Sequence, residues 1–464
     1  MQSAKSTRPD LVRDLNVWHA TAIVAGTIIG SGIFRVPGVM MKDVGSAGMV
    51  YLVWIVGGLL SFAGALTYAE LGAMKPWAGG EYVYVRDAYG PLPGFLYAWT
   101  WFLIAKPGSI ATVTTGIVDV IGTFQRFSYL GKAFFVWHIT STRSFEVTYG
   151  HLFAIAATIL ISAVNYIGVK KAGSFQLVFT SLKIAMIAAI IFIGFTASTG
   201  GWSNFHTTFL GAKGGMAGFM AALVAALWAY DGWNDLNMVS GEIRSPERSI
   251  PIALIAGVAI VAVLYMGINA AVQYVLPASA IAGSKVPASL ATQMAIGPVG
   301  AALVSIGMAL SMFVTLNGTI MSGGRIPFAV ARDGYFFKSL ADVHPVFHTP
   351  HRAIVVQAIV AIVLLLAGGA FSELLNLTIF AEWLFYMIAA TTIFVFRRRE
   401  PNLPRPYRTW GYPVVPAVFV IVAAILLVYT FRDNLQNSII GTLVILAGIP
   451  VYLYFARQRK AMPG

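Results

Sequence analysis

Long apolar runs separated by short polar segments dominate the pattern of this chain. A helix needs about 20 predominantly apolar residues to span a bilayer. Runs of this kind lie at roughly 17–41, 47–74, 92–122, 148–166, 174–196, 215–240, 251–277, 294–323, 351–367, 373–396, 413–431 and 437–456. Membrane-spanning strands would instead show about ten residues of alternating polarity, a pattern that is absent here. The sequence therefore predicts an all-α integral membrane protein with about 12 transmembrane helices.

Composition agrees with this prediction. Only 11% of the 464 residues are charged and 58% are hydrophobic, whereas a soluble domain carries roughly 25% charged residues. Most of the surface must therefore face lipid. The segments between the apolar runs are short, the longest being roughly 123–147 and 324–350, and neither is long enough for an independent soluble domain.

The distribution of basic residues predicts the topology. The formal net charge is +13, which in a soluble protein would suggest a nucleic-acid partner. If the N-terminus is cytoplasmic, however, 21 of the 31 Lys and Arg fall on the cytoplasmic side and 8 on the opposite side. Cytoplasmic loops of membrane proteins carry this excess of positive charge. We therefore expect both termini in the cytoplasm and no nucleic-acid partner.

Several kinds of chemistry have no basis in the sequence. There is no cysteine, so thiol nucleophiles, thiolate metal sites and a disulfide-linked partner are excluded. The polar N-terminal stretch MQSAKSTRPDLVRD gives no indication of a removable signal peptide. The seven histidines lie mostly in loops or at span ends, without the spacing of metal ligands. We therefore expect no cofactor, no metal and no enzymatic activity, and no repeated pore loop or charged ring indicates a channel.

The first apolar run is interrupted near its middle. It reads TAIVAGTIIGSGIFRVPG, with Gly26, Gly30, Ser31 and Gly32 in its centre. Glycine and serine favour local unwinding here, which frees backbone N–H and C=O groups at membrane depth. Because lipid cannot bind these groups, they must line a cavity or contact a ligand. A single Gly-x-Gly in a membrane helix is also compatible with close helix packing.

The sixth run has a second interruption. In LVAALWAYDGWNDLNMVSGE, the polar residues Asp231, Gly232 and Asn234 lie well inside an apolar helix. A charged residue at the centre of a membrane helix costs about 2.5–3.5 kcal/mol on the insertion scale. The two breaks are five spans apart, so the sixth span crosses the membrane in the opposite direction. Paired breaks in oppositely oriented halves indicate the midplane site of a transporter.

A helix break of this kind suits both ends of a zwitterion. The free N–H groups at the start of its second half favour an anion, and the bare backbone of Gly30, Ser31 and Gly32 allows a carboxylate to approach closely. The carbonyls of Ile28 and of residues 228–231 would accept the amine. A small amino acid is therefore the expected ligand.

Four stretches also match a known family. GTIIGSGIF (26–34), YAELG (68–72), AYDGWN (229–234) and GRIPFAVARDG (324–334) resemble the amino acid–polyamine–organocation transporters, and within them the L-type amino acid exchangers and their bacterial relatives. The resemblance implies a LeuT-type fold in a plasma (bacterial inner) membrane. The implied units are a cytoplasmic N-terminus 1–16, a first five-helix repeat 17–200, an inverted second repeat 214–396, two extra helices in 413–456 and a cytoplasmic C-terminus 457–464.

The resemblance also implies roles for residues at the breaks. It assigns carboxylate contacts to Ser31 and Gly32, and it places Trp228 where related exchangers carry an aromatic gate, although packing remains an alternative for this residue. Asp231 departs from the small residue of animal L-type members, so it favours a cationic substrate as a second reading. The predicted substrate-binding residues are Ile28, Gly30, Ser31, Gly32, Ile33, Trp228, Asp231, Gly232 and Asn234.

Two further ionisable residues lie inside spans. L-type relatives place a lysine at the position of Lys183, where its ammonium resembles a substitute for the sodium ion of other LeuT-type carriers, with Ser311 and Thr315 as candidate partners. Snorkelling of Lys183 to the interface is the alternative. Glu382 is compatible with a structural role or with proton transfer. Proton transfer is also compatible with Asp231.

Further charged residues lie within the third span and at the cytoplasmic ends of helices. The Lys106–Pro107 pair, which resembles a basic-Pro pair of the L-type group, favours a shaping role in its helix over substrate contact. Charges at cytoplasmic helix ends, among them Glu242 and Arg325, are compatible with solvated faces or with a gate of ion pairs.

Together these features predict a sodium-independent exchanger of small or neutral L-amino acids that works by alternating access in the lipid bilayer. A proton-coupled symporter of amino acids, or of cationic amino acids or polyamines, is the alternative.

Overall fold

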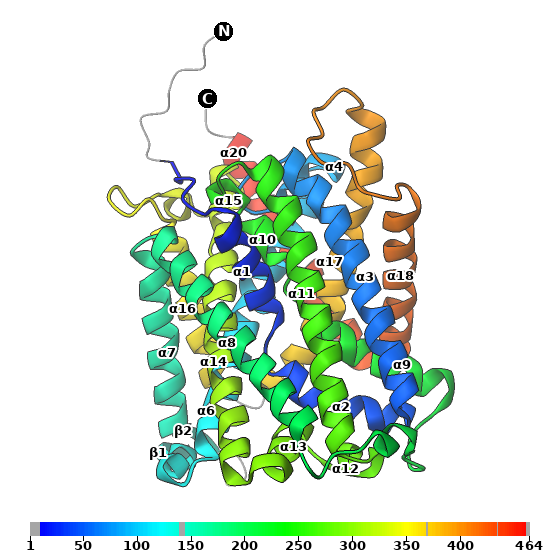
Figure 1. The fold of residues 1–464 in the computed structure, drawn as a ribbon. Coiled ribbons are helices and arrows are strands. Elements are labelled where there is room, and N and C mark those ends of the chain that lie inside the picture. Colours follow the sequence, from blue (N-terminus) through cyan, green and yellow to red (C-terminus); the bar gives the residue numbers. More distant parts are fainter. Residues whose placement is uncertain (1–9, 139–143, 368–369, 434, 461–464) are drawn as a thin grey trace.

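The chain forms a bundle of long helices packed side by side (Figure 1). The computed structural model describes residues 10–138, 144–367, 370–433 and 435–460. Its first helices are α1 (Val17–Ile28), α2 (Gly32–Val44), α3 (Ala47–Met74), α4 (Glu81–Tyr89), α5 (Pro91–Thr100), α6 (Lys106–Gly122), α7 (Tyr149–Tyr166) and α8 (Val169–Thr196). They are followed by α9 (Gly215–Ala229), α10 (Asp235–Met238), α11 (Pro246–Val275), α12 (Ala278–Gly283), α13 (Pro287–Ile296), α14 (Pro298–Gly323), α15 (Arg325–Arg332), α16 (His351–Leu366), α17 (Ala370–Arg399), α18 (Val414–Asp433), α19 (Leu435–Leu446) and α20 (Gly448–Lys460).

Many of these helices have the length and apolarity of membrane spans. Within the described ranges, 9 helices meet both criteria, or 10 if the bent pair of α1 and α2 is one span, and α9 and α16 are shorter apolar helices. Helices prevail because a segment in lipid must pair its own backbone groups. Each predicted apolar run coincides with helix. The prediction of an all-α membrane architecture is confirmed, while the number of spans stays a prediction.

A small hairpin lies in one of the two longest predicted loops. Strands β1 (Ala133–His138) and β2 (Ser144–Thr148) pair antiparallel between α6 and α7, at the lower end of the bundle in Figure 1. The hairpin is too short to span a membrane, so it does not alter the helical class of the fold.

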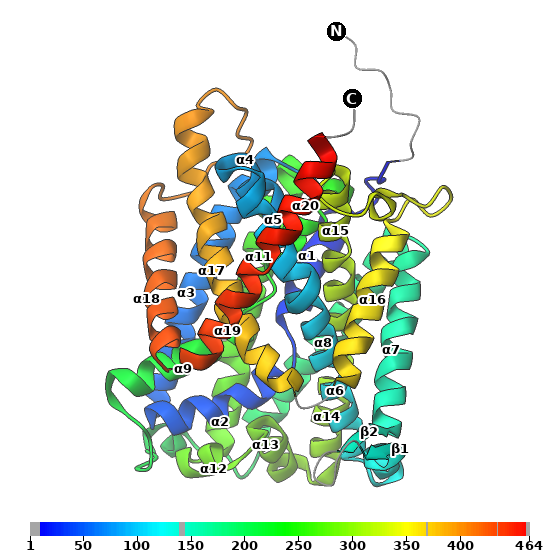
Figure 2. The same ribbon diagram turned by 180° about the vertical axis from the view of Figure 1, so that it is seen from behind.

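The two predicted broken spans run in opposite directions. Figure 1 shows α1 toward the upper end of the bundle and α2 at the lower end, whereas α9 is low and α10 is high. Figure 2 shows α20 near the upper end as well. The beginning of α1 and the end of α20 therefore share the upper end of the bundle, while α2, α13 and the hairpin form the lower end.

Buried contacts close the upper end. The carboxylate of Glu242 accepts two hydrogen bonds from Arg325, at 2.7 and 2.9 Å, and both side chains are fully buried. The guanidinium also donates to the carbonyl of Met321 at 2.7 Å. Leu15 lies across this region, because its N–H donates to the carbonyl of Glu242 and its own carbonyl accepts from Arg244. Of the two predicted readings, solvated faces and ion pairs, the structure confirms an ion pair for Glu242 and Arg325.

A second buried carboxylate ties the end of α17 to α3. Glu70 accepts two hydrogen bonds from Arg397, at 2.9 and 2.7 Å, and a third from the backbone N–H of Thr409 at 2.6 Å. The Glu70 side chain is 1% exposed. Its negative charge is therefore balanced inside the protein rather than solvated.

The buried pair at the upper end should contribute strongly to stability. Replacing Glu242 with Gln leaves the Arg325 charge buried without a counter-ion, which costs about 3–5 kcal/mol. Asp10→Asn is the matched control, because the Arg332–Asp10 pair is exposed, at 45% and 72%, and such pairs contribute about 0–1 kcal/mol. In detergent, the unfolding temperature should fall markedly for Glu242→Gln and hardly at all for Asp10→Asn. Equal, small losses would contradict the assignment.

Candidate functional site at the paired helix breaks

The first break lies between α1 and α2. These helices meet at an angle of 40°, and Ile29, Gly30 and Ser31 between them are not helical. The first N–H groups of any α-helix have no partner within that helix, so the amides of Gly32 and Ile33 carry the positive end of the α2 dipole. Ser31 occupies the N-cap without a side-chain capping bond, which leaves its hydroxyl available to a ligand beside these amides.

The second break lies between α9 and α10. The helix ends at Ala229 and resumes at Asp235, and Gly232 has a φ of +104°, in the left-handed region that favours glycine. A Cβ at Gly232 would lie 3.1 Å from the carbonyl carbon of Thr27 on α1. Both predicted interruptions are therefore confirmed, and the second presses directly on the first.

Side-chain hydroxyls join the two breaks. The Thr27 hydroxyl lies 2.8 Å from the Gly232 carbonyl oxygen. The hydroxyl of Tyr265 on α11 lies 3.1 Å from the carbonyl oxygen of Ile28 and 2.8 Å from that of Ala229. The carbonyls of Ile28 and Ala229 are among the predicted acceptors of a substrate amine. Because a carbonyl oxygen has two lone pairs, each retains capacity for a second donor.

Tyr265 was not singled out from the sequence. No local signal marks it, because it lies in an ordinary apolar stretch of α11 and its role comes from the neighbours that the fold supplies.

The Lys183 ammonium lies against the end of α1. Its nitrogen donates to the carbonyls of Gly26 at 2.8 Å and Ile29 at 2.7 Å, and the residue is fully buried. Ser311 on α14 donates to the same Ile29 carbonyl at 2.7 Å, and the Thr315 hydroxyl lies 3.4 Å from the carbonyls of both Gly26 and Ile29. The alternative in which Lys183 snorkels to the interface is wrong. All three side chains contact the first break, while the role of Lys183 as a substitute for a sodium ion stays a prediction.

Trp228 stands beside the first break rather than in the core. It is 43% exposed, and a Cβ at Gly32 would lie 3.4 Å from its ring. This exposure leaves the indole free to move relative to α2. The gating role stays a prediction.

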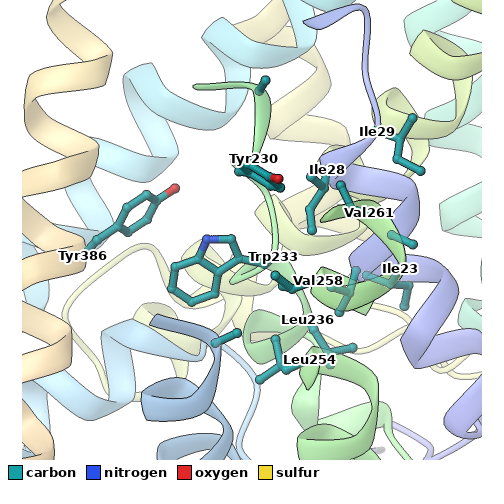
Figure 3. Packing of buried hydrophobic residues seen from close by; sticks show 14 of the residues in the cluster. Ile23, Ile28, Ile29, Tyr230, Trp233, Leu236, Leu254, Val258, Val261 and Tyr386 are labelled. Carbon is teal, nitrogen blue, oxygen red and sulfur yellow. The ribbon is translucent and has the colours of Figure 1, made fainter. Parts of the chain in front are cut away.

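An intramembrane group of charges lies next to the second break. Asp231 accepts a hydrogen bond from the Tyr386 hydroxyl at 3.0 Å. Figure 3 shows Tyr386 on one side of Tyr230 and Trp233, with Ile28 of α1 on the other side. Lys106 forms an ion pair with Asp235. Tyr386 and Asp235 were not singled out from the sequence, although the latter belongs to the same interrupted stretch as Asp231.

One cation serves three acids in this group. Asp235 also accepts from the Ser322 hydroxyl at 3.0 Å, and the charges of Asp231 and Glu382 act on Lys106 as well. Three carboxyl groups thus share one cation beside the second break, and ionising all three together would be costly in this buried position. Lys106 follows directly on a short π-helix, Trp101–Ala105, as expected where proline removes a backbone donor.

Asn234 contacts a buried carboxylate. Its amide donates to a carboxylate oxygen of Glu81 at 2.7 Å, and both side chains are fully buried. Burial raises the pKa of the Glu81 carboxyl to about 7, and the hydrogen bond from Asn234 opposes this rise. Direct substrate contact by Asn234 stays a prediction. In the described ranges no cluster of three or more His, Asp or Glu has the arrangement of a metal site.

The chain matches known proteins over almost its whole length. The family model described as amino acid permease matches residues 15–454. The chain belongs to this family. It is also 32% identical over 457 residues to the serine/threonine exchanger SteT of Bacillus subtilis, covering 97% of this chain and 98% of that protein.

Two human proteins have a similar level of sequence identity to this permease. Identity is 30% over 462 residues with b(0,+)-type amino acid transporter 1 of Homo sapiens, covering 99% of this chain and 91% of that protein. It is 31% over 447 residues with large neutral amino acids transporter small subunit 2 of Homo sapiens, at 95% and 80% coverage. The family confirms the LeuT-type fold and a membrane transporter rather than an enzyme.

Gly232 should tolerate no side chain. Gly232→Ala combines a positive φ with contact against Thr27, and strain of this kind costs about 1–3 kcal/mol. We expect a lower unfolding temperature together with reduced uptake in liposomes. Gly48→Ala is the control, because nothing lies within 4 Å of a Cβ at Gly48, and it should be neutral. An alanine variant at Gly232 with parental stability would argue against close contact of the two breaks.

Proposed function

We propose that this permease is a sodium-independent exchanger of small or neutral L-amino acids. The observation that carries the proposal is the fully buried Lys183 ammonium, which donates to the carbonyls of Gly26 and Ile29 at the first break. Carbonyl and hydroxyl oxygens are the ligands that a hard cation prefers. A lysine ammonium held among them fills the place of a sodium ion, so transport needs none.

The start of α2 binds the substrate carboxylate. The Gly30 backbone, the Ser31 hydroxyl and the amides of Gly32 and Ile33 surround the positive end of the helix, where an anion is stabilised. Gly30 and Ser31 are partly exposed, so both are accessible to a ligand.

The substrate amine binds the carbonyl oxygens of Ile28 and of residues 228–231. Tyr265 holds two of these carbonyls in place, and Gly232 lets the two breaks approach closely. The Trp228 indole closes over the bound amino acid. The positive end of the α2 dipole thus matches the carboxylate of a zwitterion, and the carbonyl acceptors at the two breaks match its ammonium group.

The relatives support both substrate class and exchange. One protein similar over nearly its whole length is a serine/threonine exchanger, and others are amino acid transporters. With no cysteine in the sequence, the permease works without a disulfide-linked partner.

The upper end of the bundle faces the cytoplasm of a bacterial cell. The excess of Lys and Arg on the predicted cytoplasmic loops supports this orientation. The buried Glu242–Arg325 pair then closes the inner side, and it must separate when the carrier opens inward. Rocking of the helices around the two breaks alternates access to the site.

The charge group beside the second break favours one alternative. Asp231 and Glu382 share a single cation, Lys106, with Asp235, and intramembrane acids of this kind serve as proton relays or as partners of cationic substrates. A proton-coupled symporter, or a carrier of cationic amino acids or polyamines, is therefore the second candidate.

Transport in sodium-free liposomes tests the proposal. Uptake of a panel of labelled amino acids is followed in empty liposomes, in liposomes preloaded with unlabelled amino acids, and under an inward proton gradient. An exchanger takes up label only when preloaded and ignores the gradient. Gradient-driven uptake into empty liposomes would support the symporter, and absence of transport in every condition would overturn the substrate class.

Lys183 gives a sharper prediction. Lys183→Ala removes charged hydrogen bonds worth about 1.5–3 kcal/mol each, so sodium-free exchange should fall by about tenfold or more. The vacated oxygens of Gly26, Ile29, Ser311 and Thr315 should then bind sodium, and added sodium should restore part of the rate. Lys285→Ala, at an exposed lysine, is the control. Unchanged sodium-free exchange by the Lys183 variant would refute the proposal that Lys183 takes the place of a sodium ion.

A further inference from the structure

A cavity of about 400 Å³ opens at the lower end of the bundle. Residues of α2, α6, α13 and α14 line it, and its walls are mostly apolar. Two opposite charges stand out among them, Arg35 on α2 and Asp119 on α6. The volume corresponds to roughly a dozen waters at about 30 Å³ each, so a small amino acid fits with part of its hydration.

Neither charge is neutralised by contact. Arg35 and Asp119 interact electrostatically across the cavity, but in the described part of the chain neither forms an ion pair or a side-chain hydrogen bond. Arg35 is half-buried and Asp119 is exposed. A guanidinium and a carboxylate that face a common space without touching leave both sets of hydrogen-bonding groups available to a third molecule.

The cavity begins one helical turn from the first break. Arg35 follows Ser31 by four residues, so the two share a face of α2 about 6 Å apart along its axis. On α14, Met308 of the cavity wall precedes Ser311 by three residues. A molecule in the cavity is therefore next to the proposed substrate site and on the side opposite to the Glu242–Arg325 closure.

We propose that this cavity is an outer binding site for the zwitterionic head of an amino acid. The Arg35 guanidinium binds the α-carboxylate, since its planar fork matches carboxylate geometry, and the Asp119 carboxylate binds the α-ammonium. The amino acid then moves one turn along α2 to the break. This inference rests on the proposed function, because it assigns a second, outer subsite to the same transport route.

Exchange kinetics measured separately from the two sides of the membrane test the outer subsite. The permease is reconstituted in liposomes, and exchange of one labelled neutral amino acid is measured against its concentration outside and, separately, inside. For Arg35→Gln and for Asp119→Asn, we expect the outer KM to rise about tenfold, as for loss of a charge-assisted hydrogen bond, while the inner KM and the maximal rate stay at parental values. Arg126→Gln, an exposed arginine at the same end, should change none of these.

Three results would overturn the inference. An unchanged outer KM would show that the two charges do not hold substrate. An equal fall of the maximal rate in both directions with unchanged KM would make them an ion pair that closes the route. A parental protein that neither exchanges amino acids in liposomes nor binds them in detergent would remove the proposed function too, which distinguishes that failure from failure of the outer subsite alone.

Discussion

Unpaired backbone at membrane depth is the constraint on which the rest of this structure depends. Breaking a helix inside the bilayer frees carbonyl and amide groups that lipid cannot bind. The protein supplies donors from three other helices, namely Lys183, Tyr265 and Ser311, together with Thr27 of α1 itself. These donors satisfy carbonyls only. In the described part of the chain, the amides of Gly32 and Ile33 receive no such partner. The site therefore offers free N–H groups beside carbonyls that already accept one hydrogen bond.

The buried charges follow the same logic of compensation. Lysine and arginine enter the interior only where oxygens or carboxylates receive them, as with Arg325 on Glu242 and Lys183 on backbone carbonyls. In the group around Lys106 the compensation is incomplete, because three carboxyl groups, those of Asp231, Asp235 and Glu382, share one cation. An imbalance of this kind is costly in a low dielectric, and it lies directly beside the second break. The cost is understandable if a proton or a cationic group of a ligand completes the balance.

The two ends of the bundle differ in how they are closed. At the upper end, the N-terminal segment pairs with residues around Ile243 over a fully buried ion pair. At the lower end, a cavity reaches toward the start of α2, and the charges that face it remain apart. Alternating access requires that the two ends are never open at the same time. A buried ion pair closes the upper end, whereas Arg35 and Asp119 stay apart at the cavity of the lower end, so these charges differ between the two ends.

The sequence by itself determined the membrane class, the positions of the apolar helices and the two interruptions, because each depends on local composition over about 20 residues. It also marked Lys183, since an isolated charge in an apolar run is conspicuous. Tyr265 and the pairing of Lys106 with Asp235 were decided only by the tertiary structure. A tyrosine in an apolar helix carries no local sign of its partner, and residues more than a hundred positions apart meet only through the packing of helices. The same limit applies to Asn234, because nothing in its own stretch indicates the hydrogen bond that its amide donates to Glu81.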